Sequence, residues 1–277
     1  MYALANAPLA EAAFTILGVP FDDTTTHRKG AKLAPSAIRE ESYNFETYLP
    51  DIDVDLADVG ICDGGDVTCE SLGDLAILKQ EVHQVLDEGS FPILMGGEHS
   101  LTPRAVSAFS DVRVVCLDAH LDFRSQYMGK DGHACVTRRI AEQLGAERVM
   151  VVGVRSMSRG EKNDAEEMGL RFVSMDDLRL GKKDMKWALG SLGEGPIYLS
   201  VDMDVVDPAY APGVGNPEPG GVTPAEVVRW IDTLADRMVG FDVVETCPPY
   251  DNGCTASLAA WFINRVVGSV WKARDSR

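Results

Sequence analysis

Short apolar runs recur along the chain, and segments with the period of an amphipathic helix lie between them. The runs are apolar at consecutive rather than alternate positions, which is typical of strands buried on both faces of a parallel sheet. Six strands are predicted, at residues 14–18, 91–95, 113–117, 149–154, 197–201 and 239–244.

The intervening segments carry helix signals. Residues 75–86 form an apolar stripe at helical spacing that ends before Gly89, and residues 223–226 form a capping box with proline at the first helical position. Helices are also predicted to begin at Thr102 and to cover about residues 255–272. Strand–helix alternation along the whole chain predicts one α/β domain, residues 1–277, with a mostly parallel sheet.

Composition narrows the classes of function. The 277 residues carry a formal net charge of −17, which argues against nucleic-acid binding because phosphate backbones require surplus lysine and arginine. No apolar run approaches the roughly 20 residues that span a bilayer, and no basic segment precedes an apolar stretch at the N-terminus. A cytoplasmic protein that does not bind membranes is therefore expected.

The sequence contains six cysteines, and none of them forms a CxxC pair. In an intracellular chain of this length they are expected to be small core residues or free thiols rather than a disulfide framework. A zinc site built on Cys247 and Cys254 would lack its remaining ligands.

Candidate metal ligands follow three of the predicted strands, at the edge where parallel sheets bind ligands. Residues 118–122, Asp-Ala-His-Leu-Asp, place two carboxylates and one imidazole on one face if the strand continues. Residues 202–204, Asp-Met-Asp, place two more carboxylates in the same manner. Like charges so close together require a neutralising cation. His99, in a Gly-Gly-Glu-His-Ser segment, is weaker evidence alone because an ordinary tight turn also explains it.

Together the three segments supply two imidazoles and four carboxylates, from His99, Asp118, His120, Asp122, Asp202 and Asp204. Four negative charges balance two divalent cations. An oxygen-rich set with some imidazole suits Mn²⁺ better than zinc, although Co²⁺, Ni²⁺ and Fe²⁺ are also compatible with it. The pattern indicates a hydrolase with two divalent metal ions, because such pairs activate a bridging water.

The three segments, in this order, resemble the metal motifs of the ureohydrolases, the family of arginase and agmatinase. The resemblance extends over nearly the whole chain and includes residues 18–22, 34–39, 217–221 and 243–245. It implies a three-layer α/β/α fold with a central eight-stranded, mostly parallel sheet and two Mn²⁺ ions. It further implies that His99 and His120 bind different metals, and that the protein hydrolyses a guanidinium group to urea and an amine.

By the same resemblance, two further residues take part in catalysis. Glu245, at the end of the last predicted strand, pairs with the substrate guanidinium, a planar group that suits a carboxylate partner, and His133 links the site to solvent as a proton shuttle. In the mechanism that we hypothesise, Asp122 relays a proton to the departing amine. Without the resemblance, Glu245 reads as a solvated acid and His133 as a structural residue. His27 and His83 are expected to be structural or solvated.

The far end of the substrate is less constrained. Residues 18–22 and 211–221 are more similar to agmatinase than to arginase, which favours agmatine, with N1-aminopropylagmatine next. An acidic pocket would also suit the cationic tail of agmatine. Arg124, in the loop after Asp122, either favours a carboxylate, as in arginine or guanidinobutyrate, or points to solvent. The expected reaction is hydrolysis of agmatine to putrescine and urea.

Two other interpretations stay open. The site could belong to a dinuclear hydrolase of a formimino, amide or phosphate group, or to a non-catalytic protein that binds a metal or ligand. Urea release from a panel of guanidino compounds separates these possibilities. The resemblance also implies a homo-oligomer, either a trimer or a hexamer.

Overall fold

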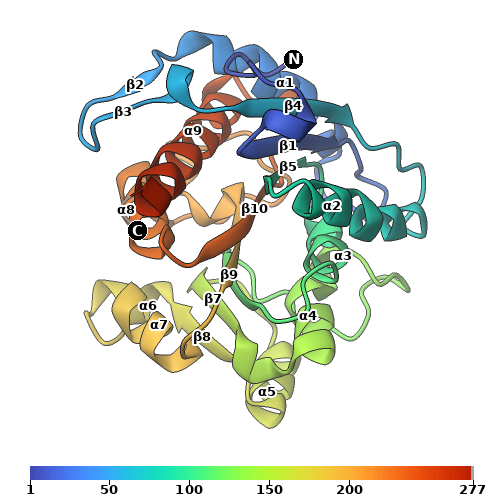
Figure 1. Cartoon of the computed structure of the whole chain (residues 1–277). Helices are drawn as coiled ribbons and strands as arrows, with labels where there is room; N and C mark the ends of the chain where they lie inside the picture. Colours follow the sequence, from blue (N-terminus) through green and yellow to red (C-terminus); the bar gives the residue numbers. More distant parts are fainter. Residues whose placement is uncertain (276–277) are drawn as a thin grey trace.

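A central parallel sheet with helices on both faces organises the chain, as seen in a computed structural model that describes residues 1–275 (Figure 1). Its strands are β1 (Phe14–Val19), β4 (Ile61–Asp66), β5 (Phe91–Gly96), β6 (Arg113–Leu117), β7 (Val149–Val154), β8 (Arg171–Ser174), β9 (Ile197–Asp202) and β10 (Met238–Val244). Their spatial order is β4-β1-β5-β10-β9-β6-β7-β8, and all neighbours are parallel. The predicted eight-stranded α/β/α architecture is confirmed.

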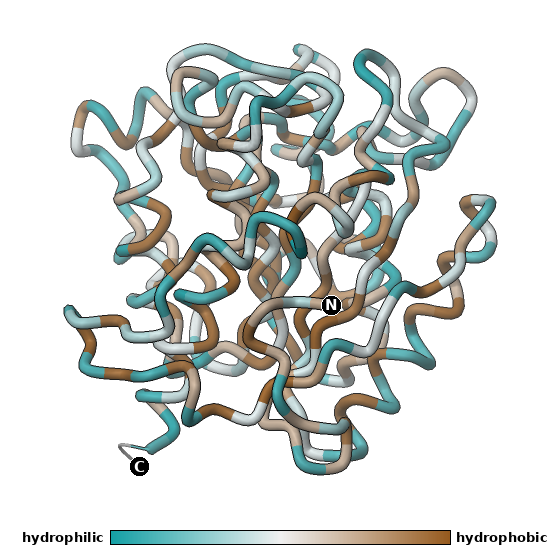
Figure 2. Tube along the Cα trace, turned by 90° about the horizontal axis from the view of Figure 1, so that it is seen from above, coloured by the Kyte–Doolittle hydropathy of each residue, from teal (hydrophilic) through white to brown (hydrophobic). Residues whose placement is uncertain are grey.

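Two hydrophobic clusters cover the two faces of the sheet. Neighbouring strand residues alternate between them: in β6, Val115 and Leu117 join one cluster, and Val114 and Cys116 join the other. This alternation explains why the central strands are apolar at consecutive positions. The polypeptide trace in Figure 2 is accordingly hydrophobic in the interior and more hydrophilic along the outer segments.

The helices divide between the two faces according to their buried side chains. The first face is covered by α1 (Ala34–Glu41), α6 (Met175–Arg179), α7 (Met185–Leu192), α8 (Pro224–Leu234) and α9 (Cys254–Asp275). The second is covered by α2 (Leu78–Asp87), α3 (Thr102–Val106), α4 (Val136–Leu144) and α5 (Arg159–Met168). The predicted capping box is present at the start of α8, where Thr223 and Glu226 each accept a hydrogen bond from the other's backbone N–H.

Two strands of the main sheet were not predicted, and both lie at its edges. β4 reads Ile-Cys-Asp-Gly-Gly-Asp and buries only its first two residues fully, and β8 buries only Val173 fully. Edge strands need less apolar sequence because one side of the strand faces solvent, so they lack the continuous apolar run of the interior strands. A separate antiparallel pair, β2 (Tyr48–Leu49) and β3 (Val54–Asp55), was also not predicted.

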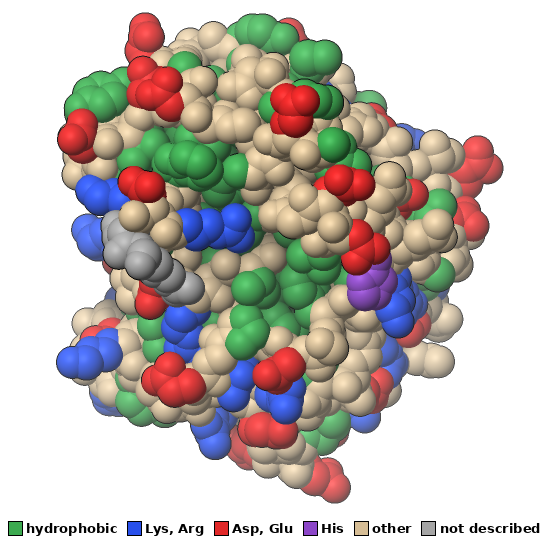
Figure 3. All heavy atoms as spheres, viewed as in Figure 1, with side chains coloured by type: hydrophobic (Ala, Val, Ile, Leu, Met, Phe, Trp, Pro, Cys, Tyr) green, Lys and Arg blue, Asp and Glu red, His purple; other side chains and the backbone are tan. Residues whose placement is uncertain are grey.

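The distribution of acidic side chains and the state of the cysteines agree with what the composition predicted. Acidic side chains are dispersed over the face seen in Figure 3 rather than gathered into one patch. Within residues 1–275, no helix has the length and apolar character needed to cross a bilayer. All six cysteines are free thiols, and only Cys254 is exposed. No candidate metal group in this part of the chain includes Cys247 or Cys254.

Candidate metal centre

Two overlapping groups of side chains at the carboxyl ends of β5, β6 and β9 could each hold a metal ion. One group is His99, Asp118 and Asp202, and the other is Asp118, His120 and Asp204. Within each group the ligand atoms lie within 4.8 Å of one another. Asp118 belongs to both groups, so two ions bound there would share a carboxylate.

The turn after β5 brings His99 to this edge of the sheet. A Cβ atom on Gly97 would lie 1.9 Å from the backbone oxygen of Phe21, so only glycine fits there. The backbone N–H of the next residue, Glu98, donates to that same oxygen at 2.8 Å. Gly97 therefore permits the close approach of two backbone segments that positions His99.

In the first group, a ring nitrogen faces three carboxylates. His99 Nδ1 lies 3.2 Å from Asp118 Oδ2, 3.3 Å from Asp202 Oδ2 and 3.6 Å from Asp122 Oδ2. His99 Nδ1 and Asp118 Oδ2 are both buried, and neither has a hydrogen-bond partner among the described residues. Buried polar atoms are rarely left unpaired. A cation between them would satisfy both atoms, so these residues fit a divalent metal.

In the second group, His120 Nδ1 lies 2.8 Å from Asp204 Oδ2 and 3.7 Å from Asp118 Oδ1. The carboxylates of this group are held by backbone donors: the N–H of His120 donates to Asp118 Oδ1 at 2.6 Å, and the N–H of Ala119 donates to Asp204 Oδ1 at 3.1 Å. These bonds fix the direction of each carboxylate before any ion binds.

The candidate ligands do not alternate on continuing strands, and that part of the prediction was wrong. β6 ends at Leu117, and Asp122 follows it in a loop with a positive φ of 50°. Asp202 is the last residue of β9, and Asp204 belongs to the short 3₁₀ turn Met203–Val205. The six side chains still lie close together, because the segments that carry them lie at the carboxyl ends of β5, β6 and β9.

The acidic cluster carries more negative charge than its own surroundings can stabilise. Burial, together with the charge of Asp118, raises the pKa of Asp122 to about 7. Burial and the neighbouring carboxylates Asp204 and Asp118 raise the pKa of Asp202 well above its usual range. Desolvation and like charges both favour the protonated form. A divalent cation would remove both penalties, in agreement with the unpaired atoms of His99 and Asp118.

Glu245 lies beside the first group, immediately after β10. Its side chain is buried, and its Oε1 accepts the backbone N–H of His99 at 2.9 Å. Burial and the nearby Glu98 raise the pKa of Glu245 to about 8. Its φ of 65° is a conformation that non-glycine residues rarely adopt. Such local strain is concentrated at functional sites.

His133 faces Glu245 across a gap of 3.8 Å between Nδ1 and Oε1. Its Nε2 lies 3.1 Å from Thr26 Oγ1, and its backbone N–H donates to Thr24 Oγ1 at 3.0 Å. Burial, followed by the charges of His120 and His99, lowers the pKa of His133 to about 4. In the absence of metal ions the imidazole is therefore neutral near pH 7.

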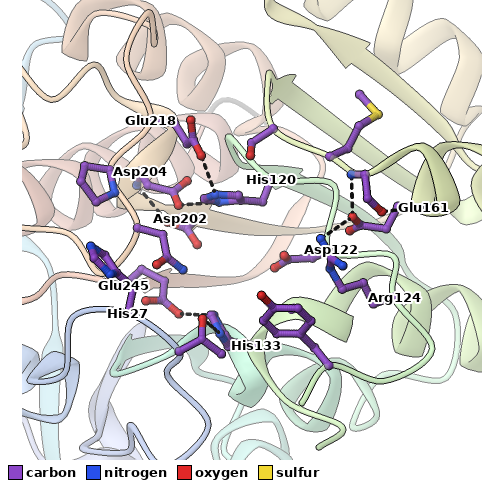
Figure 4. Close-up of a pocket in the computed structure, with 18 of the residues that line it drawn as sticks. His27, His120, Asp122, Arg124, His133, Glu161, Asp202, Asp204, Glu218 and Glu245 are labelled. Carbon is purple, nitrogen blue, oxygen red and sulfur yellow. Dashed lines mark hydrogen bonds and ion pairs between the residues drawn. The ribbon is translucent and has the colours of Figure 1, made fainter. Parts of the chain in front are cut away.

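Most of these side chains line one cavity of about 560 Å³ (Figure 4). Its lining includes His120, Asp122, His133, Asp202, Asp204 and Glu245, whereas His99 and Asp118 are buried and do not line it. Another part of its wall contains Arg124, Tyr127, Glu161 and Glu218. The exposed His27 also lines the cavity, whereas His83 lies exposed on α2, so both are solvated as expected.

Three acidic residues of this region were not singled out from the sequence. Glu98 is fully buried and accepts the backbone N–H of Thr24 at 2.8 Å. Glu161 pairs with Arg124 at 2.9 Å, and Glu218 Oε1 lies 3.5 Å from His120 Nε2. The Ser-x-x-Glu spacing at 158–161 signals a capping box, but it does not signal a cavity wall.

Comparison with known proteins gives one consistent result. The sequence model of the Arginase family matches residues 12–268. An N(1)-aminopropylagmatine ureohydrolase from Thermococcus kodakarensis is 37% identical, and an agmatinase from Pyrococcus horikoshii is 36% identical; each alignment covers 96% of this chain and 94% of the relative. The crystal structure of agmatine ureohydrolase of Thermoplasma volcanium superposes with a TM-score of 0.94 at 40% identity, covering 99% of this chain and 95% of that one.

Proposed function

The chain belongs to the arginase family and is a hydrolase, and we propose that it is a dinuclear ureohydrolase that converts agmatine to putrescine and urea. The observation that carries this proposal is that two candidate metal groups and the buried Glu245 adjoin a single cavity. A metal centre alone suits many hydrolases, whereas the added carboxylate suits a guanidinium substrate.

The proposed ligands of the two ions are divided by the two imidazoles. His99 would serve one ion and His120 the other, with Asp118 shared between them. Asp122 and Asp202 would complete the His99 site, and Asp202 and Asp204 the His120 site. When bound, Mn²⁺ supplies a Lewis acid and makes water a nucleophile near neutral pH.

Glu245 would orient the substrate. Its Oε1 is engaged by the backbone N–H of His99, which leaves the Oε2 atom for a guanidinium N–H. The hydrogen bond from the Glu245 N–H to Gly97 O at 2.8 Å holds its backbone against the turn that carries His99. Substrate and candidate metal ligands would therefore be positioned by the same turn.

Proton transfer is assigned to Asp122 and His133. The Asp122 carboxyl lines the cavity beside the candidate metal ligands, so it is placed to carry a proton toward the departing amine. The neutral imidazole of His133, between Glu245 and Thr26, is suited to exchange protons with solvent.

Charge balance supports a cationic tail. Four aspartates would balance two divalent ions, and Glu245 would balance the guanidinium. Arg124 and Glu161 neutralise each other in the cavity wall. Glu218 remains; within residues 1–275 it forms no ion pair with lysine or arginine, and it is 34% exposed. It offers a negative charge to the ammonium tail of agmatine.

N1-aminopropylagmatine is a second candidate substrate. The relative from Thermococcus kodakarensis that carries this name is 37% identical over 96% of this chain. A cavity of about 560 Å³ belongs to the size class that encloses drug-sized ligands, so it has room for a longer polyamine tail.

A substrate panel tests the proposal. The Mn²⁺-supplied protein is assayed for urea release from agmatine, aminopropylagmatine, arginine and guanidinobutyrate, and kcat/KM is compared. Agmatine is expected to give the highest value. The variant Glu245→Gln keeps the size of the side chain and should lower kcat/KM by roughly 10²-fold or more, because the guanidinium loses its charged partner.

Three results would count against the proposal. Urea release from none of the four compounds would favour a different dinuclear hydrolase or a non-catalytic binding protein. A higher kcat/KM for arginine or guanidinobutyrate would reassign the substrate. Unchanged turnover by Glu245→Gln would remove Glu245 from the site.

A further inference from the structure

Arg124 brings a positive charge to the cavity wall, but the charge does not stand alone. Its Nη2 lies 2.9 Å from Oε2 of Glu161, and its guanidinium stacks over the ring of Tyr127 at 4.6 Å from the ring centroid. All three residues line the same cavity as the candidate metal ligands (Figure 4). A ligand in the cavity therefore meets an ion pair at this position.

Glu161 is fixed in place independently of Arg124. Its Oε2 accepts the backbone N–H of Ser158 at 2.8 Å as part of the capping box of α5, and its Oε1 lies 3.4 Å from the N–H of Phe123. The Glu161 side chain is 5% exposed, whereas Arg124 is 35% exposed. Glu161 is thus the buried, anchored member of the pair, and Arg124 is held against it.

We propose that Glu161 is a specificity-determining residue that withholds Arg124 from carboxylate-tailed guanidino compounds, an inference that rests on the proposed ureohydrolase function. A substrate carboxylate could take the Arg124 guanidinium only by displacing Glu161, which would leave an anchored, buried carboxylate without its cation. Leaving a buried carboxylate without its charged partner is unfavourable. An ammonium tail meets no such obstacle, and Glu218 offers it a carboxylate in the same cavity.

Pairing with Glu161 reverses the substrate preference that Arg124 would give by itself. An unpaired arginine in this loop would favour arginine or guanidinobutyrate over agmatine. With Glu161 in place, the charges of Arg124 and Glu161 cancel. The remaining carboxylate, Glu218, then favours substrates with a cationic tail. Selectivity would therefore be set by the partner of Arg124 rather than by Arg124.

The variant Glu161→Gln tests this directly. Glutamine retains an acceptor for the N–H of Ser158, and capping boxes accept either residue, so the start of α5 is expected to persist. Arg124 then carries an uncompensated charge. The ratio of kcat/KM for 4-guanidinobutyrate to that for agmatine is expected to rise by about two- to fivefold, as for a partly exposed ion pair.

Two controls identify the cause of the change. The double variant Arg124→Gln/Glu161→Gln removes both charges and should return the ratio close to that of the wild type. Glu166→Gln makes the same substitution elsewhere on α5, at an exposed residue near Lys162, and should leave the ratio unaltered. The inference is overturned if Glu161→Gln and Glu166→Gln give the same ratio, or if the double variant shows the full rise.

A binding measurement keeps the test independent of turnover and of folding of the variant. Calorimetry on the Mn²⁺-supplied wild type should show tighter binding of putrescine than of 4-aminobutyrate, two amines that carry the competing tails. Tighter binding of 4-aminobutyrate would overturn the inference even without a variant. If the wild type releases no urea, the proposed reaction fails, and this comparison still tests whether the cavity prefers an ammonium tail to a carboxylate tail.

Discussion

Asp204 illustrates how single side chains are prepared for a cation. One carboxylate oxygen accepts the N–H of Ala119, and the other lies 2.8 Å from His120 Nδ1. Asp204→Asn keeps the shape and removes the charge. We expect at least about 10²-fold weaker Mn²⁺ binding and loss of urea release. Mutating a residue that only hydrogen-bonds to a metal ligand already lowers metal affinity or activity about 10- to 100-fold, and Asp204 is proposed as a ligand itself.

Manganese affinity is measured for this variant by competition with a chelating indicator. The control is Asp164→Asn, the same substitution at a half-exposed residue on α5 that pairs with Arg138. Near-normal affinity and turnover in Asp204→Asn would exclude Asp204 as a ligand.

His133 provides a pH signature in the metal-free protein. Burial and the charges of His120 and His99 lower its folded pKa to about 4, whereas the unfolded chain titrates near 6.5. The unfolded chain thus binds more protons between these values, so the stability that depends on neutral His133 is lost as the pH falls. Between pH 7 and pH 5 the wild type should lose about 2 kcal/mol more free energy of unfolding than His133→Asn.

Denaturant titrations of both proteins at the two pH values, with chelator present, check this difference. Parallel losses of stability in wild type and variant would show that His133 is not held neutral by its surroundings.

The acids and imidazoles that follow the strands predicted the candidate site better than the expected alternation of side chains along those strands. The six candidate ligands and Glu245 meet because acids and imidazoles that follow parallel strands converge at one sheet edge. The proposed strand alternation failed at Asp122, whose positive φ leaves no mark in the residue pattern. Glu161 was missed because its partner Arg124 lies far away in sequence, and such pairing is not encoded locally.

At the scale of elements, interior strands were predictable and edge strands were not. β6 and β9 are buried on both faces and read as apolar runs, whereas β4 and β8 mix polar and apolar residues. Helix starts with local hydrogen bonds were predictable, as in the Thr223 capping box of α8. The predicted bounds of the last helix, 255–272, were also close to the observed ones, Cys254–Asp275.

The turn between β5 and α3 requires a residue without a Cβ atom at position 97, where the sequence has glycine. In Gly97→Ala the new Cβ would meet the backbone oxygen of Phe21 at 1.9 Å, so the turn must shift. We expect a loss of about 3 kcal/mol or more in the free energy of unfolding, since a backbone atom cannot move aside as a side chain does. Metal affinity should fall as well, because His99 follows two residues later.

Gly190→Ala is the matched control for this substitution. Gly190 lies within α7, and its added Cβ would have no atom within 4 Å, so a gain of about 0.5–1 kcal/mol is expected. Chemical denaturation of both variants measures the contrast. Equal stabilities would contradict the steric account of Gly97.

For the whole molecule, metal removal should have a global effect. The candidate ligands come from the carboxyl ends of β5, β6 and β9, so bound ions would connect distant parts of the chain. Each Mn²⁺ ion, supplied at about 100 times its dissociation constant, adds about 2.7 kcal/mol to the stability of the folded state. Loss of each ion to a chelator should therefore lower Tm by roughly 5–10 °C, and added Mn²⁺ should restore it. A Tm that does not change when chelator is added would argue against divalent ions that stabilise the fold by neutralising the aspartates.

The order of strands has a consequence for synthesis of the chain on the ribosome. β10 is the last strand made, yet it lies at the centre of the sheet, between β5 and β9. Until it emerges, the nascent chain holds two partial sheets, each with an apolar edge that lacks its partner. A truncated product that ends before Met238 would therefore expose both edges and be prone to aggregate, and it would also lack Glu245.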